Sequence, residues 1–356
     1  MTDTQQNILL VAPNRVGDLV MATPAFRAIR NHLDHARITL IARPFLIDLL
    51  RPSPFFDVLL AGSGHGDGFL SMVGTIARLR KRRFDLAVLF PNSFRSALVS
   101  RLGGCKRALG YDRDARDWLL TDHLKPVIDG GRFVPVPTIE YYLELARYLG
   151  ATEDDRRMEL SVDEADRERA AELLEQAGLA RTGPLVLMSP GASFGPSKCW
   201  PAENFARTAD VLSEKLNAEV ALICAPSELE IALRVQQHSS TQPVILGQGG
   251  LTLGVLKAVI QSADLVISND TGARHIAAAL DRPALTLFGP TDPTWARIDY
   301  EKETIVRIDT DCGPCQLPNC PTDHRCMTGI APERVVDEAV ELLNRYPQGR
   351  TPNGCG

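Results

Sequence analysis

The residues of this chain best suited to chemistry are small polar ones that follow an apolar run. Residues 265–267 read Leu-Val-Ile, residues 268–272 read Ser-Asn-Asp-Thr-Gly, and an alanine-rich segment containing His275 follows. A buried strand that turns into a helix in this way presents uncovered N–H groups and a positive dipole end, which suit a phosphate. A simpler interpretation is that Asp270 or Thr271 caps the helix and that His275 packs inside it.

A lysine and an aspartate elsewhere in the chain could complete such a site. Lys198 lies in a loop of small residues, where the backbone can approach a ligand and the ammonium group suits a phosphate. The loop is not a P-loop, because Lys198 precedes Cys199 rather than Ser or Thr. Asp18 follows Gly17 at the end of the first apolar run, where it could be a general base or simply a carboxylate favoured by a helix start.

Two further loops follow apolar runs of the second half. Glu228 comes shortly after residues 220–224, where a carboxylate could grip ribose hydroxyls or remain a solvated helix-start residue. Residues 288–293, Phe-Gly-Pro-Thr-Asp-Pro, predict a tight and rigid turn next to the polar segment 268–272.

Apolar runs alternate with helical patterns throughout the chain. The strands that we expect are 8–12, 38–42, 86–90, 185–189, 220–224, 244–246, 265–267 and 284–288. Among the expected helices, 19–33 contains Pro24, which we interpret as a kink rather than a helix start. The alternation predicts two α/β domains with doubly wound parallel sheets, residues 1–170 and 171–356, with the final helix able to pack back on the first domain. Ligands bind beyond the carboxyl ends of such strands, so we expect the domains to face each other across a cleft.

The composition excludes several classes of protein. A net charge of −5 over 356 residues lacks the basic footprint of a nucleic-acid-binding protein. No apolar run reaches the roughly 18 residues of a membrane span, and the first residues lack the layout of a signal peptide. We therefore expect a cytoplasmic protein whose eight cysteines are not joined in disulfides.

Together, these loops resemble those of the heptosyltransferase family of bacterial lipopolysaccharide synthesis. The resemblance runs from Ile8 to about Leu343 and is carried by Gly-Asp with its following helix (16–30), Pro-Gly-Ala-x-x-Gly-Pro-x-Lys-x-Trp-Pro (190–201), Ser-Asn-Asp-x-Gly-x-x-His (268–275) and Phe-Gly-Pro-Thr-Asp-Pro (288–293). The Gly-Pro-x-Lys form around Lys198 is more similar to the members that add the second heptose than to those that add the first.

The resemblance implies a GT-B glycosyltransferase. Its amino-terminal domain would take a heptosyl-Kdo2-lipid A inner-core acceptor, and its carboxy-terminal domain would take ADP-L-glycero-D-manno-heptose. Asp18 falls at the position of the catalytic base, and Lys198 falls where a lysine faces the donor phosphates. The positions expected to bind donor or substrate are Gly17, Ser193, Trp200, Glu228, Asp270, Thr271, Gly272 and His275. Arg274 stands where the family often has an apolar residue.

The reaction that the resemblance implies is an inverting displacement that needs no cofactor and no metal ion. A helix dipole and a lysine can take the place of a divalent cation beside the leaving diphosphate. Asp112-x-Asp114 and Asp309-x-Asp311 imitate a metal-binding motif, but neither follows a convincing strand in a cleft loop.

Two clusters have more than one interpretation. Cys312, Cys315, Cys320 and Cys326, near His324, could hold a structural metal or be reduced thiols in a packed loop. The basic run at residues 78–83 could be a solvated helix end, or it could bring the protein to the anionic cytoplasmic face of the inner membrane.

Other functions fit the same pattern. A type I heptosyltransferase, another nucleotide-sugar transferase or a nucleotide-sugar epimerase would share the fold and the donor loops. A protein that binds a nucleotide sugar without turnover is a non-enzymatic alternative.

Overall fold

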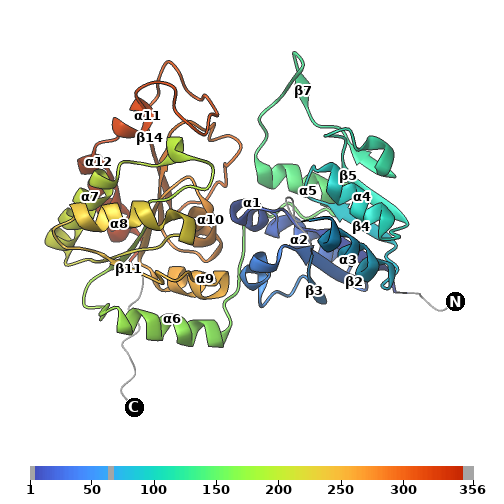
Figure 1. Cartoon of the computed structure of the whole chain (residues 1–356), viewed down its shortest axis with the longest axis horizontal. Coiled ribbons are helices and arrows are strands. Elements are labelled where there is room, and N and C mark those ends of the chain that lie inside the picture. The colour runs from blue at the N-terminus through green and yellow to red at the C-terminus, as the bar shows by residue number, and fades with distance from the viewer. Residues whose placement is uncertain (1–4, 63–67, 348–356) are drawn as a thin grey trace. The chain divides into compact units, whose positions relative to one another are not determined.

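The structure, a computed structural model, describes residues 5–62 and 68–347, and the chain divides into two compact units (Figure 1). The first unit ends at Ser161 and also includes the later segment Thr294–Ile298. The second unit begins at Val162 and contains the rest of the chain.

The first unit is built on a parallel sheet of six strands in the order β3-β2-β1-β4-β5-β6. The strands are β1 (Asn7–Val11), β2 (Arg37–Ala42), β3 (Val58–Ala61), β4 (Leu86–Leu89), β5 (Arg107–Tyr111) and β6 (Asp122–Leu124). The central strand β1 has a buried middle, Ile8 to Leu10, as a parallel strand covered on both faces requires.

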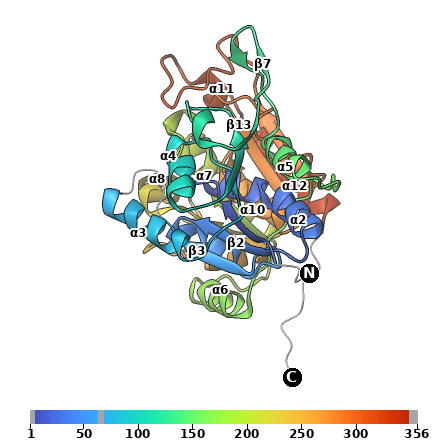
Figure 2. The same cartoon turned by 90° about the vertical axis from the view of Figure 1, so that its right-hand side faces the viewer.

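The helices that accompany this sheet in the described residues are α1 (Val16–Met21), α2 (Thr23–His32), α3 (Phe69–Arg80), α4 (Phe94–Leu102) and α5 (Thr138–Tyr148). The neighbouring helices α3 and α4 can be followed in Figures 1 and 2. A small hairpin, β7 (Ile128–Asp129) with β8 (Arg132–Phe133), precedes α5. The later segment joins this unit because the N–H and Oγ1 of Thr138 both donate to the carbonyl oxygen of Trp295, at 3.0 and 2.8 Å.

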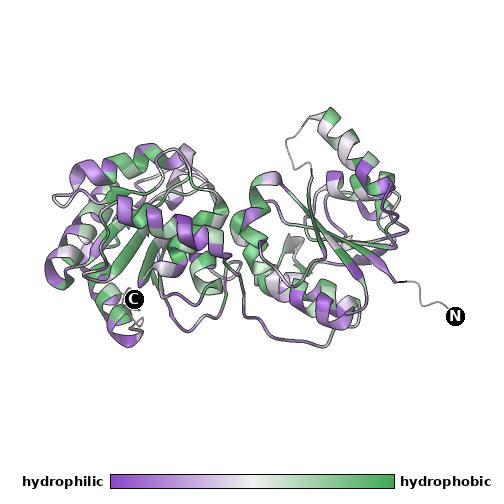
Figure 3. Cartoon of the chain, turned by 90° about the horizontal axis from the view of Figure 1, so that it is seen from below, coloured by the Kyte–Doolittle hydropathy of each residue, from purple (hydrophilic) through white to green (hydrophobic). Residues whose placement is uncertain are grey.

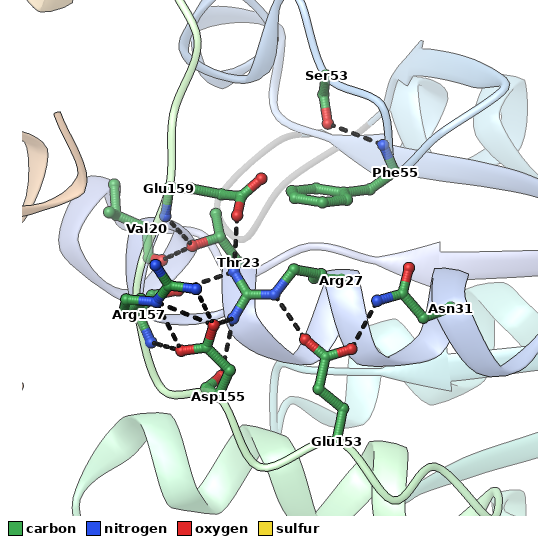
Figure 4. Close-up of polar contacts among 10 residues, drawn as sticks. All are labelled: Val20, Thr23, Arg27, Asn31, Ser53, Phe55, Glu153, Asp155, Arg157 and Glu159. Carbon is green, nitrogen blue, oxygen red and sulfur yellow. Dashed lines mark hydrogen bonds and ion pairs between the residues drawn. The ribbon is translucent and has the colours of Figure 1, made fainter.

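The segment that ends the first unit is fastened to α2 by Arg27 (Figure 4). The guanidinium donates to Glu153 and Glu159 at 2.7 Å each and to the carbonyl oxygen of Asp155 at 2.8 Å. The N–H of Glu159 donates to Oγ1 of Thr23 at 3.1 Å. The polar stretch after α5 is therefore held on the first unit almost to its last residue.

The second unit repeats the same plan. Its parallel strands lie in the order β11-β10-β9-β12-β13-β14. They are β9 (Leu185–Ser189), β10 (Glu219–Leu222), β11 (Val244–Ile245), β12 (Leu265–Asn269), β13 (Ala284–Phe288) and β14 (Glu303–Arg307). The helices are α6 (Glu164–Gln176), α7 (Ala202–Leu216), α8 (Leu229–His238), α9 (Leu253–Ser262), α10 (Gly272–Ala279), α11 (Arg325–Thr328) and α12 (Pro332–Arg345).

One hydrophobic core of the second unit lies between its sheet and the helices α7, α8 and α12. Val186 and Met188 of β9 pack there with Phe205 of α7 and with Val336 and Leu342 of α12. Figure 3 shows the apolar strands inside and the polar faces of the helices outside. The last helix thus packs against α7 within its own unit.

The two sheets share the strand order of doubly wound nucleotide-binding folds, so the predicted fold class is confirmed. Chain connections leave on opposite sides of the first strand of such a sheet, which opens a crevice at its carboxyl end. That point lies between β1 and β4 in the first unit and between β9 and β12 in the second.

One predicted element is wrong. The single helix expected over residues 19–33 is two helices, α1 and α2, that meet at Ala22. Pro24 lies in the first turn of α2, where its missing N–H leaves no hydrogen bond unmade, so it marks a helix start rather than a kink. Among the helices of the described ranges, none is long and apolar enough to cross a bilayer.

Candidate nucleotide-sugar site

Four loops of the second unit leave the carboxyl ends of neighbouring parallel strands. They follow β9, β10, β12 and β13, and they contain Lys198, Glu228, Asp270 and Thr291. β9 and β12 flank the crevice of this sheet. The loop after β9 that contains Lys198, here called the lysine loop, therefore lies on one side of the crevice, and the polar turn before α10 lies on the other.

Lys198 and Asp270 form a direct ion pair. Lys198 ends the short 3-10 turn Pro196–Lys198, and its Nζ lies 2.5 Å from Oδ2 of Asp270. The same ammonium group donates to the carbonyl oxygen of Asp270 at 3.2 Å, and Oγ1 of Thr291 donates to Oδ2 at 3.2 Å. Burial alone would raise the pKa of Asp270, but the positive charges of Lys198 and Arg274 hold that pKa below its usual value.

The start of α10 has the polar atoms of a ligand site. Thr271 is its N-cap residue, with extended backbone and no capping hydrogen bond from its side chain. Among the described residues, buried atoms without a hydrogen-bond partner include Oγ of Ser268, Oγ1 of Thr271 and Nδ1 of His275. Buried polar atoms are normally paired, so this group suits the oxygen atoms of a ligand beside the N–H groups that begin at Gly272.

His275 is buried and neutral. Burial, helped by the charge of Arg274, lowers the pKa of its imidazole to about 3. It therefore offers one N–H and one lone pair rather than a positive charge.

Asn269 is a residue of the site that sequence reasoning missed. Its buried amide donates to the carbonyl oxygens of Pro190 and Gly191 at 2.8 and 3.2 Å, and its Oδ1 accepts the N–H of Trp200 at 3.1 Å. It thus joins the lysine loop to the end of β12. The polar run 268–272 contained the signal, because a fully buried strand seldom ends in an asparagine without a partner for it.

Trp200 has a different place from the one expected. Its side chain has no exposed surface, packs edge-on against Phe205 and donates from Nε1 to the carbonyl oxygen of Ile330 at 3.0 Å. A ligand at the surface therefore cannot contact its ring, and Trp200 anchors the lysine loop in the core.

Glu228 and Ser193 flank the same edge. Glu228 is half-buried, which raises the pKa of its carboxyl group, and its Oε2 accepts the N–H of Ala225 at 3.1 Å. A Cβ added at Gly191 would come within 2.3 Å of the Glu228 side chain, so any other residue at this position would displace that side chain. Ser193 is exposed on the lysine loop.

The cysteine-rich segment supports the lysine loop from behind. Nε2 of His324 donates to the carbonyl oxygen of Ser197 at 2.7 Å, and Oγ of Ser197 donates to the carbonyl oxygen of Leu317 at 2.6 Å. Within residues 5–62 and 68–347, no three His, Cys, Asp or Glu side chains come together as metal ligands. The two interpretations of Cys312, Cys315, Cys320 and Cys326 stay predictions.

In the first unit, Asp18 lies in the first turn of α1, beyond the carboxyl end of β1 and beside Gly17. It is partly exposed. The pKa of the Tyr142 hydroxyl is raised, first by burial of that tyrosine and second by the negative charge of Asp18. Asp18 thus occupies the crevice position of its own sheet.

A cavity opens next to this position. Its walls include Asn14 after β1, Arg43 after β2, and Ser93 and Arg95 at the start of α4. Two arginines and five small polar residues, Asn14, Thr75, Ser93, Ser96 and Ser100, would suit an anionic and hydroxylated ligand.

The chain is similar in sequence and fold to known proteins. The chain is 28% identical to lipopolysaccharide heptosyltransferase 2 of Escherichia coli, over 94% of this chain and 98% of that protein. It is 27% identical to lipooligosaccharide heptosyltransferase 2 of Haemophilus ducreyi, over 94% and 99% of the two chains. The solved structure of the E. coli ADP-heptose lipopolysaccharide heptosyltransferase II superposes with a TM-score of 0.80, at 26% identity, over 96% of this chain and 99% of that one.

Fold and sites define a glycosyltransferase of the GT-B class, with two doubly wound units. The model of glycosyltransferase family 9 (heptosyltransferase) matches residues 73–325, and the chain belongs to that family.

Proposed function

We propose that this protein transfers L-glycero-D-manno-heptose from ADP-heptose to the heptosyl-Kdo2-lipid A inner core of lipopolysaccharide, with inversion at the anomeric carbon. The observation that carries the proposal is the Lys198–Asp270 pair beside the unpartnered polar atoms at the start of α10. The similarity to heptosyltransferase 2 proteins over nearly the whole chain supports the second heptose as the one added.

In the donor unit, Lys198 and the N–H groups from Gly272 onward would hold the diphosphate. Thr271 and His275 would add hydrogen bonds, and Glu228 would accept from the ribose hydroxyls. Negative charge grows on the diphosphate as the bond to the sugar breaks, and preorganised donors aimed at that charge lower the barrier.

In the acceptor unit, Asp18 would act as the general base. An acceptor hydroxyl oxygen forms the new bond to the anomeric carbon, its proton passes to the Asp18 carboxylate, and the bond from that carbon to the diphosphate breaks to release ADP. Arg43 and Arg95 beside Asn14 would hold the anionic sugars of the acceptor.

We further propose peripheral contact with the cytoplasmic face of the inner membrane. Phe69, Leu70 and Val73 are exposed at the start of α3, and the basic run 78–83 follows at its end. Apolar and cationic groups on one helix suit an anionic bilayer surface. Cosedimentation with anionic vesicles that falls as salt rises is expected, and salt-insensitive absence of binding would contradict it.

An ADP-release assay tests the transfer. The expected result is release that depends on the monoheptosylated acceptor and is absent with the unheptosylated one. Preference for the unheptosylated acceptor would indicate a type I enzyme. Free sugar formed without an acceptor would indicate an epimerase, and ADP-heptose binding without turnover would indicate a non-enzymatic role.

A further inference from the structure

A charged side chain is fully buried in the second unit. Arg274, the third residue of α10, has no exposed surface. Its guanidinium pairs in a fork with Glu303 of β14, through Nε to Oε1 and through Nη2 to Oε2 at 2.9 Å. Oγ1 of Thr286, on β13 next to β14, donates to the same carboxylate at 2.7 Å. Glu303 is thus satisfied on both oxygens.

The other side of the guanidinium faces the donor site. Nη1 of Arg274 lies 3.4 Å from Oδ1 of Asp270, whereas Lys198 and Thr291 hold the Oδ2 atom of that carboxylate. The charges alternate in sign from Lys198 through Asp270 and Arg274 to Glu303. Lys198, at one end of this series of charges, lies at the proposed phosphate site, and Glu303, at the other end, lies in the core.

A gain in folding stability alone does not explain such a series of buried charges. Taking two charges out of water costs more than their attraction usually returns, and apolar side chains of similar volume often stabilise a core better. The carboxylate that this arginine can steer is that of Asp270, which in turn holds Lys198.

We propose that Arg274 and Glu303 are positioning residues that hold Asp270, and through it Lys198, in place for the donor diphosphate. This inference rests on the proposed function of the same site. Glu303 orients the guanidinium, the guanidinium fixes one oxygen of Asp270, and the other oxygen is left to Lys198. Neither Arg274 nor Glu303 touches the substrate.

The decisive variant removes both charges together. Arg274→Met with Glu303→Leu leaves no unpaired charge in the core, so we expect an unfolding temperature at or above that of the wild type. Lys302→Met is the matched control, because it removes a cation one position from Glu303 that pairs with the exposed Asp281 and lies over the ring of Tyr346. Arg274→Lys keeps a charge without the fork and should restore part of the loss.

Two measurements report on the site itself. Calorimetric titration with ADP should show a Kd about tenfold higher for the double variant, and kcat with ADP-heptose should fall about tenfold. The ionisable groups that face Asp270 are Lys198, Arg274 and His275. Loss of Arg274 should therefore raise the pKa of Asp270 and move the acid limb of the activity profile to higher pH.

The outcomes separate this inference from the proposed function. A double variant with wild-type Kd, kcat and acid limb would overturn the positioning role while the transfer reaction stands. A wild-type chain that neither binds ADP nor turns over ADP-heptose would overturn both. The same losses in Lys302→Met as in the double variant would show a general electrostatic effect and also overturn the inference.

Discussion

Nζ of Lys198 lies 2.5 Å from Oδ2 of Asp270, a residue 72 positions further along the chain. The two come from loops after the adjacent strands β9 and β12, and their side chains are only 13% and 7% exposed. A cation held this way is preorganised for the charge that develops on a leaving diphosphate.

Replacement of Lys198 by alanine should lower kcat with ADP-heptose by about 10²-fold, because the leaving charge loses its nearest cation. Steady-state ADP release measures this. Lys215→Ala, which removes an exposed lysine from the last turn of α7, should leave the rate within twofold. An equal effect of both variants would contradict a specific role.

Replacement of Asp18 by asparagine should reduce turnover by roughly 10²-fold or more while ADP binding is kept, because only the proton acceptor is lost. Single-turnover kinetics and calorimetry together test it. Asp34→Asn, at an exposed position after α2, is the control. Near-normal turnover in Asp18→Asn would remove Asp18 from the role of base.

His275 should make stability depend on pH. The pKa of its imidazole is about 3 in the folded chain and near the ordinary value of about 6.5 in the unfolded chain. Between these two values the unfolded state binds a proton and the folded state does not, so stability falls as the pH falls below 6.5. The contribution is about 1 kcal/mol of lost stability between pH 7 and pH 5.5. Urea unfolding at both pH values should show a smaller acid loss in His275→Gln, and an identical loss would contradict the prediction.

Arg27→Ala should destabilise the first unit by about 2 kcal/mol, because two carboxylates and two carbonyl groups lose their shared donor. Thermal unfolding measures it, and limited proteolysis should cut faster in residues 152–160. Arg157→Ala is the control, since that exposed side chain pairs with Asp155, two positions away. Equal shifts in the two variants would contradict the role of Arg27 in fastening the segment after α5 to α2 (Figure 4).

The sequence by itself determined the fold class and most of the loops that carry the site. Apolar runs such as 185–189 and 265–267 are local signals, and the small polar residues after them mark where each strand ends. Four strands of the two parallel sheets, β3, β5, β6 and β14, were not predicted. β3 and β14 are partly exposed edge strands, β5 contains Arg107 and Gly110 among its five residues, and β6 has three residues, two of them polar. The break between α1 and α2 also escaped, since Pro24 can either kink or start a helix.

Only the tertiary structure decided which side chains meet. Trp200 belongs to a motif that suggests ligand contact, yet the packing of α7 and of the chain around Ile330 buries it. Arg274 pairs with Glu303, on a strand 29 positions later, and Asn269 forms hydrogen bonds with a loop that leaves the adjacent strand. Such pairs depend on strand order and register, which bring distant residues together, and no local periodicity in the chain encodes them.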